Sequence, residues 1–88
     1  MHRTRKGELA RLHRAVVISR LAVDAARGEL IEALGDWMCG SDNPPPSAEE
    51  IAELARLVEA QEQAEASYAS CIAALSEEWV AHARRRRA

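Results

Sequence analysis

Residues 39 to 50 read CGSDNPPPSAEE, and this stretch decides the fold. It concentrates turn-forming residues and contains all three prolines of the chain, none of which has an amide hydrogen to donate to a helix. Directly after them, Ser47 and Glu50 form an S-x-x-E capping box, in which the serine hydroxyl accepts a hydrogen bond from an amide of the first helical turn. The sequence therefore predicts a Pro-rich loop at 39–47, between a helix that ends near Met38 and a second that begins at about Ala48.

On both sides of this loop, apolar residues recur every three or four positions, which is the spacing of one helix face. The first run covers about 6–38, and its seam comprises Leu9, Leu12, Val16, Ser19, Val23, Ala26, Leu30, Ala33 and Trp37. The second covers about 48–84, and its seam comprises Ile51, Leu54, Val58, Gln61, Glu65, Tyr68, Ile72, Leu75, Trp79 and His82. Two such seams joined by a short loop predict a single all-α domain over 1–88, folded as an antiparallel helical hairpin.

The composition agrees with long helices and excludes several other classes. Ala, Glu, Leu and Arg dominate the 88 residues, phenylalanine is absent and only four glycines occur, which excludes a β-sandwich, a Rossmann-type enzyme and a collagen-like or disordered chain. No apolar run approaches the roughly 20 residues of a membrane span, and no signal-peptide core follows the basic N-terminus. Two cysteines are too few for a disulfide framework. We expect a cytoplasmic protein, and the excess of arginine over lysine favours a bacterial or phage source.

The first helix has a second apolar face that one partner helix cannot cover. This face combines large apolar residues with alanine and glycine, and we call it the α-stripe; it comprises Val17, Leu21, Ala25, Gly28, Ile31, Gly35 and Met38. The second helix is apolar on one side only. We expect the α-stripe to contact a second copy of the chain, which gives a homodimer built as a four-helix bundle. The charge distribution favours two hairpins that run in opposite directions.

Positive charge gathers at the two chain ends, which a hairpin brings to one pole. Residues 1–14 and 84–87 together have a net charge of +8, whereas residues 15–81 have −10. The candidate partner-binding residues here, which we call the basic pole, are Arg3, Arg5, Lys6, Arg84, Arg85, Arg86 and Arg87. Such a pole suits an acidic protein surface or nucleic-acid phosphates, and it also fits plain solvation of a helix end. The chain lacks the interleaved aromatics and helix-turn-helix spacing of many nucleic-acid binders.

No catalytic or metal-binding pattern is recognisable among the remaining residues. Cys71 lies about 36 Å along the second helix from Ser47, too far from Cys39 for a disulfide, so we expect Cys71 to be a small core residue. The histidines and acids lack the spacing of known metal sites. The polar segment 61–65 lies opposite Arg20 in the expected pairing, and it indicates a polar layer that sets the register of the helices. We expect no cofactor, no metal, no small-molecule substrate and no enzymatic activity.

Trp37 and Met38 precede the loop, where they either pack within the hairpin or form a partner-binding tip. Together these features predict a non-enzymatic protein–protein interaction module, of the adaptor, chaperone or inhibitor type, that homodimerises and docks on another protein with an acidic or apolar surface. The alternative is a nucleic-acid-associated accessory factor that binds through the basic pole.

Overall fold

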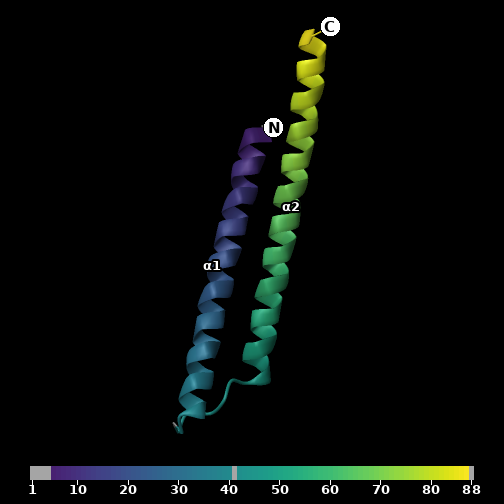
Figure 1. Ribbon diagram of the computed structural model, residues 1–88. Helices are drawn as coiled ribbons and strands as arrows, with labels where there is room; N and C mark the ends of the chain where they lie inside the picture. The colour runs from purple at the N-terminus through teal and green to yellow at the C-terminus, as the bar shows by residue number, and fades with distance from the viewer. Residues whose placement is uncertain (1–4, 41, 88) are drawn as a thin grey trace.

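Two long helices run antiparallel in the computed structural model, which describes residues 5–40 and 42–87 (Figure 1). Helix α1 spans Arg5–Met38 and helix α2 spans Ala48–Arg87, and the described ranges contain no strand. The molecule measures 73 × 27 × 15 Å, so it is a rod only one helix thick in its shortest dimension. The architecture is all-helical, as predicted, and α2 continues three residues past the predicted end at 84.

The loop is fixed at both ends by local hydrogen bonds. At the end of α1, the amide of Gly40 donates to the carbonyl of Trp37 at 3.2 Å, and Gly40 itself has a φ of +84°. That conformation favours glycine and turns the chain out of the helix. At the start of α2, the amide of Glu50 donates to Ser47 Oγ at 3.1 Å, which confirms the predicted cap. Local sequence therefore determines where both helices meet the loop.

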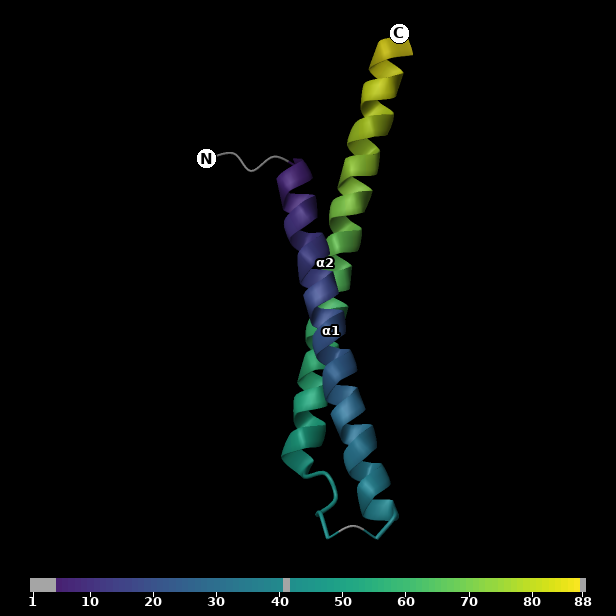
Figure 2. The same ribbon diagram turned by 90° about the vertical axis from the view of Figure 1, so that its left-hand side faces the viewer.

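The core is a short row of side chains near the place where the helices cross. The buried apolar residues among those described are Leu12, Val16, Val23 and Cys71. Figure 2 shows the two helices crossing near their middles and separating toward both ends. The expectation that Cys71 is a small core residue is confirmed, and the polar seam residue Ser19 donates to the carbonyl of Val16 at 2.9 Å. A core of this size leaves most apolar residues at least partly in water.

The predicted seams are correct in the middle of the hairpin and wrong at its ends. Trp37, Ile51 and Trp79 were expected between the helices, yet each is at least half exposed, and His82 is exposed as well. In a straight α-helix, residues spaced seven apart shift around the helix axis by about 20° per heptad. Because the two helices cross and do not coil around each other, the apolar line turns away from the partner helix toward the ends of the hairpin. On α2 the contact has moved from Ile72, which is exposed, to its buried neighbour Cys71.

Two ion pairs between the helices define their register. Arg20 Nε donates to Glu65 Oε1 at 3.0 Å near the middle, and Arg5 Nη2 donates to Glu78 Oε1 at 2.8 Å at the open end. The first pair agrees with the expected polar layer opposite Arg20. The second places the start of α1 level with Glu78, so α2 extends beyond the first described residue of α1 (Figures 1 and 2). We call residues 79–87 the overhang; it is about 13 Å long.

Neither α1 nor α2 is apolar enough along its length to cross a membrane, and no other helix occurs among the described residues.

Candidate interaction surfaces

The α-stripe lies on the exposed side of α1. Leu21, Ile31 and Met38 are 63%, 62% and 76% exposed, and Val17 is 41% exposed. Ala25 and Gly35 are also exposed, whereas Gly28 is half-buried. A Cβ atom added to either glycine of the α-stripe would meet nothing within 4 Å, so the space beside both is open. No described residue of α2 covers these large side chains, and they remain available for contact with another molecule.

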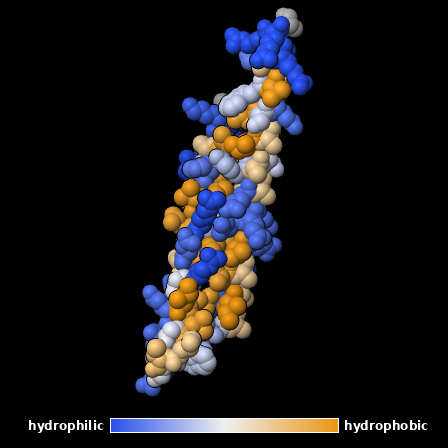
Figure 3. All heavy atoms as spheres, in the orientation of Figure 1, coloured by the Kyte–Doolittle hydropathy of each residue, from blue (hydrophilic) through white to orange (hydrophobic). Residues whose placement is uncertain are grey.

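A groove between the helices at the loop end was not anticipated from the sequence. It has a volume of about 320 Å³, and its lining comprises Arg27, Leu30, Ile31, Leu34, Pro45, Pro46, Ile51 and Leu54. Figure 3 shows apolar side chains gathered over the loop half of both helices and hydrophilic side chains at the C-terminal end of α2. The groove exists because the diverging helices no longer fill the space between them, while two prolines of the loop close one end. Ile31 belongs to both the groove and the α-stripe.

Two separate hollows, of which the groove is one, lie along one side of the hairpin, which we call the groove face. A second hollow nearer the open end is lined by His13, Val16, Val17, Arg20, Glu65 and Tyr68. On α1, members of the two linings follow one another at spacings of 3, 4 and 7, namely His13, Val17, Arg20, Arg27, Ile31 and Leu34. Such residues lie on one side of a helix. On α2 the corresponding line has spacings in multiples of seven and consists of Ile51, Glu65, Ile72 and Trp79.

The other side of the hairpin is more polar. Its hollow is lined by Arg5, Glu8, Arg11, Leu12, Ser67, Ser70 and Cys71. Five of the exposed large apolar side chains, Ile31, Leu34, Ile51, Ile72 and Trp79, lie on the groove face by their helical spacing, whereas Ile18, Leu21 and Val80 do not. The groove face is therefore the more apolar of these two sides.

The structure divides the predicted basic pole into two parts. Arg5 is engaged in closing the hairpin, because it pairs with Glu78 at 2.8 Å and with Glu8 at 3.5 Å. The hydrogen bond to Glu78 raises the pKa of Arg5 above its ordinary value. Lys6 is exposed beside it. Arg84, Arg85, Arg86 and Arg87 are exposed on the overhang, and Arg3 lies outside the described residues.

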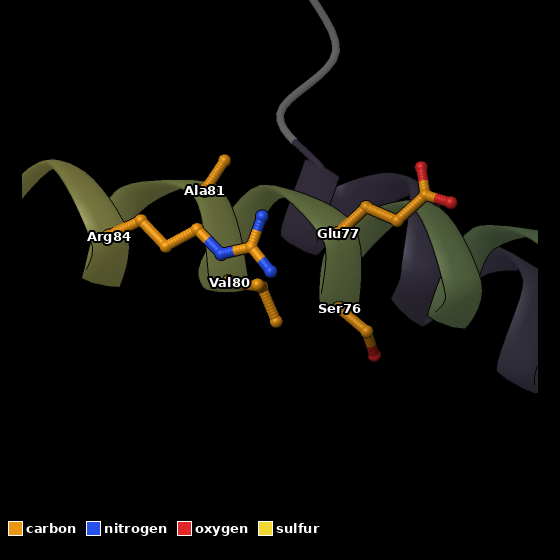
Figure 4. A pocket seen from close by; sticks show the side chains of 5 residues that line it. All are labelled: Ser76, Glu77, Val80, Ala81 and Arg84. Carbon is orange, nitrogen blue, oxygen red and sulfur yellow. The ribbon is translucent and has the colours of Figure 1, made fainter.

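The surface of the overhang has a shallow hollow of its own (Figure 4). Its lining comprises Ser76, Glu77, Val80, Ala81 and Arg84, all from α2. The side chain of Arg84 lies along the helix in the direction of Val80 and Glu77. Because α2 alone lines this hollow and no described residue of α1 faces it, a ligand there would stay largely in solvent. It is a less favourable binding site than the groove, which two helices and the loop enclose.

The electrostatics of the polar layer centre on Glu65. Its carboxylate accepts hydrogen bonds from Gln61 Nε2 and Arg20 Nε, both at 3.0 Å. The bond from Gln61 and then the bond from Arg20 lower the pKa of Glu65 below its ordinary value. This carboxylate is therefore held in its charged form at neutral pH, the protonation state that an ion pair between helices requires.

Trp37 and Met38 are both exposed at the loop end of α1, where a partner has access to them. Cys39 is exposed and Cys71 is buried, and both are free thiols. Within residues 5–40 and 42–87, no group of three His, Cys, Asp or Glu side chains is placed to hold a metal ion.

Comparisons of the chain with models of protein families, with curated proteins and with solved structures find no match.

Proposed function

We propose that the protein is a non-enzymatic interaction module, which homodimerises through exposed apolar residues of α1 and docks as a dimer on another protein. The observation that carries this proposal is the α-stripe, whose large side chains Leu21, Ile31 and Met38 are more than 60% exposed. A helix that is apolar on two sides is ordinarily covered on both. In this chain α2 covers one side of α1, and a second copy of the chain covers the other side.

The energetics support association. Burying four large side chains of the α-stripe contributes roughly 6–12 kcal/mol per chain before the costs of association, at about 1.5–3 kcal/mol each. The buried row of Leu12, Val16, Val23 and Cys71 is a thin core for an 88-residue chain. Small domains with little buried surface often rely on oligomerisation. Dimerisation thus covers the α-stripe and enlarges the apolar core.

The test is a matched pair of substitutions on α1, Ile31→Glu and Ile18→Glu. The two isoleucines are 62% and 65% exposed, so neither substitution removes a buried side chain from the monomer. Ile31 belongs to the α-stripe and the groove, whereas Ile18 lies about 140° around α1 from Ile31 and belongs to neither. Sedimentation equilibrium up to about 100 µM, where a micromolar Kd gives mostly dimer, measures the association of each variant.

We expect the wild type and Ile18→Glu to be dimeric, and Ile31→Glu to be monomeric with unchanged helicity by circular dichroism. A wild-type protein that stays monomeric at this concentration would contradict the proposal. Equal weakening by both substitutions would contradict the role of the α-stripe.

For docking on a further protein, the proposal assigns the tip Trp37 and Met38 and the exposed arginines of the overhang. Trp, Met and Arg are enriched in protein interfaces, and a cluster of arginines favours an acidic partner surface. The dimer presents each of these features twice.

A second candidate function has an observation in its favour, since four consecutive arginines project on a helix beyond its partner. An extended basic segment of this kind binds phosphates by counterion release. The test is fluorescence anisotropy with labelled duplex DNA and single-stranded RNA, with salt raised from low to physiological concentration. The control replaces Arg84–Arg87 with glutamine, a change that should leave the melting temperature nearly the same because exposed charges contribute little to stability.

Binding that falls steeply with salt and is lost in the glutamine variant would establish the nucleic-acid function. Absence of binding at low salt would exclude it.

A further inference from the structure

The two ends of the hairpin have complementary surfaces. At the open end, Trp79 is 66% exposed on the overhang, where α1 no longer accompanies α2. At the loop end, the groove between Ile31, Leu34 and Ile51 is apolar and open. Both surfaces lie on the groove face, but they are too far apart within one molecule to meet. They can meet only between two molecules.

We propose that the groove at the loop end binds the overhang of a second copy, so that two hairpins pack groove face to groove face and antiparallel. This inference rests on the proposed homodimer, because the α-stripe and the groove face share Val17 and Ile31, and it specifies the register and a second contact of that dimer. Trp79 of one copy inserts between Ile31 and Leu34 of the other. Because a two-fold dimer repeats each contact, both grooves are filled.

The register of the hairpin makes this arrangement fit the length of the molecule. Trp79 follows Glu78, which pairs with Arg5, so Trp79 is level with the start of α1. When it sits beside Ile31 of the other copy, the two-fold axis lies halfway between residues 5 and 31, at about Ile18. That position is close to the middle of a rod 73 Å long. The two hairpins therefore overlap along their whole length.

Charge complementarity favours the same arrangement. Residues 29–59, around the loop, include eight acidic residues and one arginine, a net charge of −7. With Trp79 in the groove, Arg84–Arg87 of that copy come level with Asp42, Glu49 and Glu50 of the other. Arg27 lines the end of the groove that is nearer the two-fold axis, and it lies about 13 Å along the rod axis from Arg84 of the other copy. A parallel dimer would instead bring both sets of four arginines together, which like-charge repulsion disfavours.

The first test compares Trp79→Glu with Val80→Glu by sedimentation. Val80 is 52% exposed on the overhang, but it lies about 100° further around α2 and does not belong to the groove face. We expect Trp79→Glu to raise the dimer Kd at least tenfold and Val80→Glu to change it by less than about threefold, with unchanged helicity in both. If the wild type dimerises and Trp79→Glu leaves its Kd unaltered, the docked overhang is wrong while the homodimer stands. A wild type that does not dimerise overturns both proposals.

The second test is a disulfide that only the antiparallel dimer allows. Position 86 is seven residues after Trp79, on the same side of α2, and comes level with Cys39 of the other copy. Within one chain these positions are separated by about 57 Å of helix, far beyond the 7 Å that a disulfide spans. We expect Arg86→Cys to form a covalent dimer on mild oxidation, with peptide mapping that joins position 39 to position 86.

Arg84→Cys is the matched control. It removes the same charge at nearly the same height, but position 84 faces away from the groove face, and we expect little cross-linking. Disulfides that join position 39 to 39, or 86 to 86, would show parallel hairpins and overturn the inference. Equal cross-linking of the two variants would also overturn it, because the overhang would then not be held in one orientation.

Discussion

Ser47 stabilises the first turn of α2 through one hydrogen bond, which its Oγ accepts from the amide of Glu50 at 3.1 Å. We expect Ser47→Ala to lower the free energy of unfolding by about 0.5–2 kcal/mol, because the amide loses its partner. Urea unfolding followed by circular dichroism measures the change, in the Ile31→Glu background so that association does not contribute. Ser47→Thr retains the hydroxyl and serves as the control. A stability equal to that of the parent would mean that the cap does not hold this end of α2.

Two glycines at the end of α1 should respond to alanine in opposite directions. Gly35 is helical with open space around it, so Gly35→Ala should raise the free energy of unfolding by about 0.5–1 kcal/mol. Gly40 has a φ of +84°, which alanine adopts only with strain, so Gly40→Ala should lower it. Urea unfolding of both variants in the same monomeric background provides the comparison. If Gly35→Ala is destabilising, another side chain occupies the space beside this glycine in solution.

The polar layer at Glu65, between α1 and α2, should make the stability of the fold depend on pH. The pKa of Glu65 is lowered in the folded chain, so its contribution is complete above its ordinary value of 4.5. That contribution is lost as the pH falls through the lowered value. We expect the melting temperature of the wild type to exceed that of Glu65→Gln at pH 7. At about pH 3 we expect this difference in melting temperature to be smaller. Thermal melts at both pH values measure it, and a difference that does not change with pH would show that Glu65 contributes by contact alone.

How far the elements follow from sequence depends on how local their determinants are. The loop and the start of α2 were predictable, because three prolines and the Ser47 cap act within a few residues. The central seam was also predictable, because Val16 and Val23 lie where any antiparallel pairing buries them. Which residues are buried at the ends of the seam depends on how two straight helices cross, and this is a property of the pair of helices. Trp37 and Trp79 were therefore wrongly predicted to lie between the helices. The groove was missed for the same reason.

At the open end, the function of individual charges also depended on the pair of helices. Arg5 was grouped with the other cations of the basic pole, and its ion pair with Glu78 follows from a register that sequence spacing gives only within a few residues. The overhang reflects the unequal lengths of α1 and α2, 34 and 40 residues. A basic N-terminal segment and a basic C-terminal segment are equivalent in the sequence, whereas among the described cations Arg84–Arg87 lie on the overhang and Arg5 pairs with Glu78.

For the whole molecule, the proposed full-length overlap of two hairpins has a measurable consequence in solution. The Cα radius of gyration of one hairpin is 20.4 Å. Two rods that lie side by side, with axes about 10 Å apart, have a radius of gyration of about 21 Å. The same homodimer without the docked overhang, with its two-fold axis near Gly28, would displace the rods by about 30 Å and raise the value to about 25 Å. We expect small-angle scattering of the dimer to give a value within about 1 Å of that of the Ile31→Glu monomer.

The overhang is also a part of the molecule that can be removed, whereas the rest of the hairpin contains the residues that stabilise the fold. The four buried side chains among the described residues lie between Leu12 and Cys71, so none depends on the last nine residues of α2. A helix end with few tertiary contacts opens locally at little free-energy cost, and four successive arginines make it a substrate for trypsin-like proteases. Cleavage there would leave a folded hairpin without its C-terminal arginines. A protease can thus remove the exposed arginines of this chain without unfolding it, and the second copy that we propose to cover the overhang would delay the cut.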